Sequence, residues 1–73
     1  MSKSIYSPDQ KNIAKKLKDA RLEAGIDQTL VAKIMGKSQS YVSKIEAGQR
    51  RIDVVQLKEF AKVYDKSLDY FIK

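Results

Sequence analysis

The chain has 73 residues, of which 42% are hydrophobic and 33% are charged, and 15 basic against 9 acidic residues give a net charge of +6. This length predicts a single domain, residues 1–73, with one modest core and no deep enzyme cleft. Cysteine and histidine are both absent, which excludes disulfides, thiol nucleophiles, the common zinc sites and the usual general base near neutral pH. We therefore expect no enzyme activity, no cofactor and no bound metal.

The excess of positive charge lies in the first two thirds of the chain. Residues 1–25 carry six basic and three acidic residues, residues 26–51 carry five and two, and residues 52–73 carry four and four. Such a distribution fits a polyanionic partner, although a lysine-rich surface that only aids solubility has the same charge. No apolar run reaches the length of a membrane span, and the N-terminus lacks the hydrophobic segment of a signal peptide. We expect a soluble, cytoplasmic protein with no membrane partner.

Apolar spacing and cap residues predict five helices. Their expected ranges are 8–24, 28–35, 39–47, 54–64 and 68–72. The first helix begins at Ser7-Pro8-Asp9-Gln10, where the serine is a cap, the proline suits the first helical position and the glutamine completes a capping box. Gly25 ends this helix in a left-handed conformation. The chain therefore reads as all-α.

The apolar positions predict the side of each helix that faces the core. The expected core residues are Ile13, Leu17, Ala20, Ala24, Val31, Ala32, Ile34, Met35, Val42, Ile45, Val54, Leu57, Phe60, Ala61 and Tyr64. The helix over 39–47 contributes only two of them, so most of its surface is polar.

Residues 27–48 are the most informative stretch. Two amphipathic segments of about two turns each lie on either side of Gly36, and Asp27 and Ser38 precede them as N-caps. Because the connection is so short, the two helices cross steeply, and the second can project from the domain. A helix held in this way fits the major groove of duplex DNA.

This pattern resembles the Cro and phage-repressor type of helix-turn-helix domain, often called the Xre family. The residues that carry the resemblance are, in order, Arg21, Gly25, Gln28, Val31, Ala32, Gly36, Ser38, Val42, Ile45, Glu46 and Gly48. The similarity extends from about Lys16 to Phe71. It implies a compact, lambda-repressor-like domain of five helices, in which the second and third form the helix-turn-helix.

The function that the resemblance implies is that of a sequence-specific transcriptional regulator, which binds a palindromic operator in double-stranded DNA as a homodimer. The size and layout are similar to those of restriction–modification controller proteins and of small phage or plasmid repressors. No small-molecule ligand is expected. The alternative is an antitoxin-like protein-interaction module with secondary DNA binding.

Three positions depart from the family pattern. Lys37 stands where an aliphatic residue is usual and adds positive charge near the turn. Ile52 replaces a frequent proline, and the sequence leaves open whether it packs or loosens the link to the fourth helix. Leu30 occupies a position that is commonly polar, and its burial is also left open.

Four residues on the exposed side of the third helix are candidates for reading bases: Gln39, Ser40, Ser43 and Lys44. In related proteins the positions of Gln39, Ser40 and Lys44 commonly have this role. Glutamine can pair bidentately with adenine, and lysine can donate to guanine. The alternative is an ordinary solvated helix face.

Five further residues are candidates for contacting phosphates: Gln28, Tyr41, Arg50, Arg51 and Lys18. The resemblance implies that Gln28 contacts the DNA backbone and braces Gln39. Partial burial without a phosphate contact is the alternative for Tyr41, and a polar first-turn position without a contact is the alternative for Gln28. For Arg50, Arg51 and Lys18 the alternative is a solvated basic surface.

The resemblance also implies a structural role for Arg21 and Glu46, as a partly buried ion pair that joins the first helix to the end of the third. At the C-terminus, an aromatic-rich cluster of Tyr64, Leu68, Tyr70, Phe71 and Ile72 is the candidate dimer interface. In the alternative, some of these residues close the core of their own chain. A dimer would hold two recognition helices about 34 Å apart, to meet successive major-groove faces.

Overall fold

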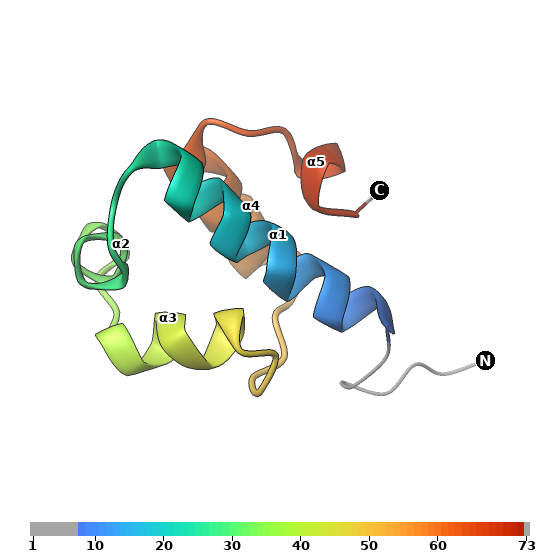
Figure 1. Cartoon of the computed structure of the whole chain (residues 1–73), viewed down its shortest axis with the longest axis horizontal. Coiled ribbons are helices and arrows are strands. Elements are labelled where there is room, and N and C mark those ends of the chain that lie inside the picture. The colour runs from blue at the N-terminus through green and yellow to red at the C-terminus, as the bar shows by residue number, and fades with distance from the viewer. Residues whose placement is uncertain (1–7, 73) are drawn as a thin grey trace.

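The computed structural model of the protein describes residues 8–72, and these form five α-helices and no strand (Figure 1). The helices are α1 (Pro8–Ala24), α2 (Gln28–Met35), α3 (Gln39–Glu46), α4 (Val54–Tyr64) and α5 (Leu68–Ile72). The predicted all-α architecture is confirmed. The third helix ends at Glu46 instead of residue 47, because Ala47 is its C-cap. The expected cap Ser7 lies outside the described residues. Within residues 8–72, no helix has the length and apolar character needed to cross a bilayer.

The turn between α2 and α3 depends on two N-caps and one glycine. Asp27 Oδ1 accepts from the Leu30 amide at 2.8 Å, and Ser38 Oγ accepts from the Tyr41 amide at 3.1 Å. Gly36 has φ +68° and ψ 32°, the left-handed conformation that glycine adopts at little cost. The backbone therefore leaves α2 at once and can start α3 three residues later.

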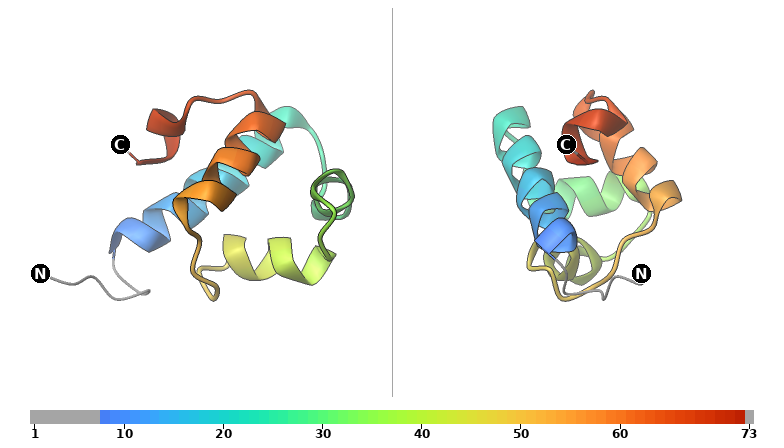
Figure 2. Two further views of the ribbon diagram at one scale, coloured as in Figure 1. Left: turned by 180° about the vertical axis from the view of Figure 1, so that it is seen from behind. Right: turned by 90° about the vertical axis from the view of Figure 1, so that its right-hand side faces the viewer.

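Packing of the other helices places α3 along one edge of the molecule. α1 packs on α3, α4 and α5, while α2 packs on α3 and α4. Figures 1 and 2 show α3 along the lower edge in every view, with α5 toward the opposite side. One long side of α3 is therefore uncovered.

The core forms where the inner sides of all five helices meet. Its buried members are Leu17, Ala20, Val31, Ala32, Tyr41, Val42, Ile45, Ile52, Leu57, Phe60, Ala61, Tyr64 and Phe71. Ile52 is only 7% exposed, so it packs and closes the link between α3 and α4. Leu30, whose burial the sequence left open, is 43% exposed and does not belong to the core.

Three residues that the sequence assigned to the core are exposed. Ala24 is the last residue of α1 and Val54 is the first of α4, so both exposed residues stand at helix ends. Ile34 is 57% exposed. At 3.6 residues per turn, it lies about 110° around α2 from the centre of the buried Val31–Ala32 pair.

Candidate nucleic-acid interface

The uncovered side of α3 is polar. The helix buries Tyr41, Val42 and Ile45 against the core. Of the predicted base-reading residues, Gln39, Ser40 and Lys44 are exposed and Ser43 is half-buried. Residues spaced by three or four positions in a helix lie on the same side, as do Gln39 with Ser43 and Ser40 with Ser43 and Lys44. The structure therefore brings these four side chains onto one surface.

A chain of side-chain hydrogen bonds leads from this surface to the partly buried Glu46. Gln39 Nε2 donates to Gln28 Oε1 at 2.6 Å, and Gln28 Nε2 donates to Glu46 Oε1 at 3.0 Å. These bonds connect the first residues of α2 and α3 with the last residue of α3. Gln28 is thus placed to brace Gln39, as the resemblance implies.

This chain of hydrogen bonds ends at a buried ion pair between α1 and α3. Arg21 Nε lies 2.8 Å from Glu46 Oε2, Arg21 Nη2 lies 3.1 Å from Glu46 Oε1, and Arg21 Nη1 donates to the Ile26 carbonyl at 3.0 Å. The two charged side chains are only 10% and 3% exposed. The hydrogen bond to Glu46 raises the pKa of Arg21 against the opposing effect of burial. Such a fork of two charge-assisted bonds fixes both geometry and charge.

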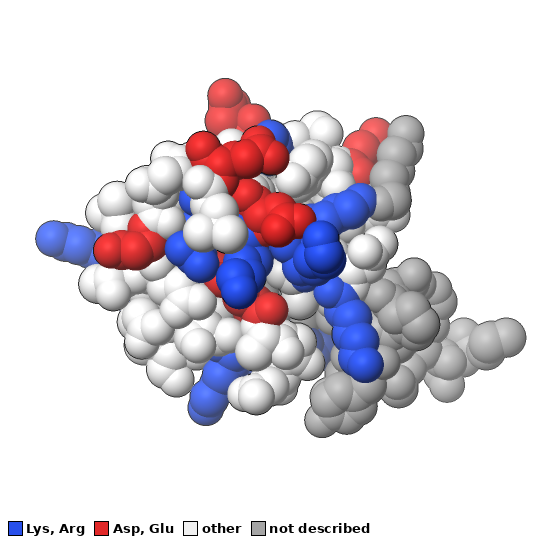
Figure 3. Space-filling view, viewed as in Figure 1, with Lys and Arg blue, Asp and Glu red and all other residues white. Residues whose placement is uncertain are grey.

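A basic hollow of about 460 Å³ lies beside the start of α3. Its lining consists of Gly36, Lys37, Ser38, Ser40, Tyr41, Lys44, Arg50 and Gln56, three of them cationic and none acidic within the described part of the chain. On the face in Figure 3, acidic and basic side chains mix over the middle of the molecule, whereas the coloured atoms along the lower edge are basic. This basic edge coincides with the position of α3 in Figure 1.

Tyr41 differs from the prediction that its hydroxyl contacts a phosphate. The residue is 9% exposed, and its hydroxyl is buried without a hydrogen-bond partner among the described residues. The ring stacks on Phe60 at 6.4 Å, while Lys37 Nζ and Arg50 Cζ lie 5.3 and 5.0 Å from its centroid. Burial raises the pKa of Tyr41, and the charge of Arg50 opposes this shift. The ring therefore contacts two cationic side chains, and its hydroxyl is buried.

The other predicted phosphate contacts lie in different places. Arg50 lines the hollow, and the exposed Arg51 follows it in the loop before α4. Lys18 is exposed on α1 and does not line the hollow. Lys37 was noted in the sequence only as a departure from the family pattern. Its place directly after the turn glycine is the signal that could have assigned it to this surface.

The predicted dimer interface is divided by the structure. Tyr64 and Phe71 are 5% and 1% exposed, because they close the core of their own chain, and they offer no surface to a partner. Leu68 and Tyr70 are half-buried, and Ile72 is 56% exposed. The prediction is therefore wrong for two of the five residues.

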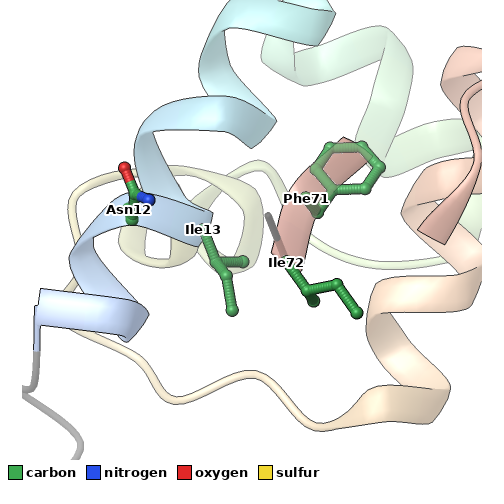
Figure 4. Close-up of a pocket in the computed structure, with 4 residues that line it drawn as sticks. All are labelled: Asn12, Ile13, Phe71 and Ile72. Atoms are coloured by element: carbon green, nitrogen blue, oxygen red, sulfur yellow. The ribbon is translucent and has the colours of Figure 1, made fainter. Parts of the chain in front are cut away.

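A second hollow, of about 260 Å³, lies between α1 and α5 and is lined by Asn12, Ile13, Phe71 and Ile72. In Figure 4 the Phe71 and Ile72 side chains leave α5 in different directions. Apolar surface therefore remains where the start of α1 meets α5.

The helices α2 and α3 are joined by a tight glycine turn, and α3 presents polar side chains beside three cations. This arrangement is typical of a helix-turn-helix protein. The chain belongs to the helix-turn-helix family HTH_3, whose model matches residues 17–71. This membership confirms the resemblance seen in the sequence.

A solved structure identifies a more specific relative. The chain is similar to the restriction-modification controller protein C.AhdI from Aeromonas hydrophila, with 27% sequence identity and a TM-score of 0.79 over 86% of this chain and 91% of that chain. No curated protein sequence matches the chain. The protein is thus a helix-turn-helix DNA-binding regulator similar to a restriction–modification controller protein.

Proposed function

We propose that this protein is a sequence-specific transcriptional regulator that binds a palindromic operator in duplex DNA as a homodimer, in the manner of a restriction–modification controller or a small phage-type repressor. The observation that carries the proposal is the exposed polar side of α3 directly beside the basic hollow. The likeness to C.AhdI supports the choice of the controller class.

Base reading is assigned to the exposed side of α3. Gln39 offers an amide that can pair with adenine, and Lys44 offers an ammonium group that can donate to guanine O6 or N7. Ser40 and Ser43 can donate or accept, so they add contacts with less preference. These four residues would set which sequence is bound.

Phosphate binding is assigned to the residues around the reading helix. Lys37 and Arg50 line the hollow, Arg51 extends it, and Gln28 stands in the first turn of α2, where free backbone amides favour an anion. Contacts of this kind fix register without reading sequence. Lys18 on α1 is a weaker member of this group because it stands apart from the hollow.

Selection of bound duplexes from a random pool tests the proposal most directly. We expect a palindromic consensus whose half-site centres are about 10 base pairs apart, together with an affinity that falls steeply as salt rises. Bound duplexes without any shared sequence would contradict the proposal. Co-purification with an unrelated protein in that case would favour the antitoxin-like alternative.

Dimerisation is assigned to the apolar surface between α1 and α5. Ile72 is 56% exposed there and lines the hollow with Ile13. Ile72→Ser should shift the protein toward monomer in sedimentation experiments. Leu22→Ser is the matched control, since Leu22 is 58% exposed on α1 but does not line the hollow. Equal effects of the two substitutions would contradict this placement of the interface.

A further inference from the structure

The hydrogen bonds that join Glu46, Gln28 and Gln39 each have a defined donor and acceptor. The last of them involves Gln39, on the exposed side of α3. We propose that Glu46 sets the hydrogen-bonding polarity of the Gln39 amide through Gln28, and so acts as a positioning residue for base preference. The inference rests on the proposed function, because it assumes that Gln39 reads a base.

The first step is the chemistry of the Glu46 carboxylate. An ionised carboxylate has only acceptor atoms, so any group that hydrogen-bonds to it must donate. The guanidinium of Arg21, which has only donors, holds both of its oxygens at 2.8 and 3.1 Å. The side chain is 3% exposed, so water has little access to act as an alternative partner. Glu46 is therefore a fixed acceptor at one end of the chain.

The second step is the orientation of the Gln28 amide, which has a donor end and an acceptor end. Its Nε2 faces Glu46 Oε1 at 3.0 Å, because the reverse orientation would bring two acceptor oxygens together. The carbonyl end of Gln28 is consequently turned toward Gln39. The half-buried position of Gln28 helps to hold this orientation.

The third step transfers the constraint to Gln39. Only its Nε2 can approach Gln28 Oε1, at 2.6 Å, since a flipped amide would again oppose two oxygens. Gln39 then has one N–H and its Oε1 left for DNA. Adenine presents an N7 acceptor and an N6 donor in the major groove, whereas guanine presents acceptors at both positions. An amide with a fixed orientation favours adenine, and an amide that is free to flip can donate to guanine O6.

Glu46→Gln tests this relay because its amide is close in shape to the carboxylate but can donate as well as accept. Glu46 Oε1 accepts from both Arg21 Nη2 and Gln28 Nε2. In the orientation that places the new amide nitrogen at this position, the bond from Arg21 Nη2 is lost, a donor faces Gln28, and the amides of Gln28 and Gln39 can both reverse. A bidentate contact discriminates between bases by about 5- to 150-fold. The assay is the ratio of the dissociation constants for the operator and for its A-to-G variant, at the base pair whose preference disappears in Gln39→Ala. We expect the ratio in Glu46→Gln to fall to less than a third of the wild-type value.

Two further variants separate polarity from stability. Arg21→Lys weakens the fork but keeps the acceptor-only carboxylate, so it should lower the melting temperature and leave the ratio unchanged. Gln28→Met interrupts the relay without touching the ion pair, so it should lower the ratio even if Glu46→Gln fails to fold. An unchanged ratio in Gln28→Met, or an equal loss in Arg21→Lys, would overturn the inference. A wild-type protein that binds DNA without any base preference would instead refute the proposed function, and this inference with it.

Discussion

Glu46→Ala removes the counter-ion of a guanidinium whose side chain is only 10% exposed. Arg21 would lose both bonds to Glu46 and keep only its bond to the Ile26 carbonyl. Removing one partner of a buried ion pair leaves an uncompensated charge and costs about 3–5 kcal/mol. We therefore expect Glu46→Ala to reduce stability first and DNA binding second.

The size of the chain makes this loss severe. At about 0.05–0.15 kcal/mol per residue, a domain of this length has a free energy of unfolding of about 4–11 kcal/mol. Each kcal/mol shifts the melting temperature of such a domain by about 4–8 °C, so the expected decrease is about 12–40 °C. The weakest wild-type stability in this range would leave Glu46→Ala largely unfolded at room temperature.

Circular dichroism during thermal and guanidinium unfolding measures the effect, and DNA binding is compared at a temperature where both proteins are folded. The control is the double variant Arg21→Met/Glu46→Leu, which buries no charge and should be more stable than Glu46→Ala. A variant that loses DNA binding completely while keeping the wild-type melting temperature would refute the structural role of the pair.

Four other substitutions test three separate parts of the structure. Gly36→Ala should lower the free energy of unfolding by about 1–2 kcal/mol because φ is +68°. An added Cβ there meets no atom within 4 Å, so a much larger loss in urea unfolding would contradict this explanation. Burial raises the pKa of Tyr64 above that of the unfolded chain, so its contribution to stability is complete below about pH 10 and declines as pH rises above it. Tyr64→Phe should reduce this alkaline decline in urea midpoints, and identical pH profiles would exclude Tyr64 as a cause. Lys44→Ala should relax sequence preference, whereas Arg50→Ala should weaken binding to all duplexes alike, and matching preference profiles would contradict this division of roles.

The helices could be predicted because their ends depend on local chemistry. Asp27, Ser38 and Gly36 each act on backbone groups within a few residues, so their effects are visible in the sequence. The family pattern likewise implied the pairing of Arg21 with Glu46, although 25 residues separate them.

Other features depend on packing between distant segments, which spacing alone does not reveal. Periodicity shows that Tyr64 and Phe71 belong to an apolar face, but not whether their own chain or a second copy covers it. The covering of Tyr41 by Lys37 and Arg50 requires the loop after α3 to fold back, and no local signal encodes this. The bond from Gln28 to Glu46 was missed for the same reason.

The ring of Tyr41 links the interior of the domain to its basic edge. It stacks on Phe60 in the core and lies beneath Lys37 and Arg50 at the surface. Long cationic side chains normally lose conformational entropy when they bind, about 0.5–1.5 kcal/mol for each side chain that is immobilised. Here part of that ordering precedes any encounter with DNA. A substitution that repacks Phe60 is therefore expected to weaken the proposed phosphate binding from inside the domain, without changing any of the residues proposed to contact DNA.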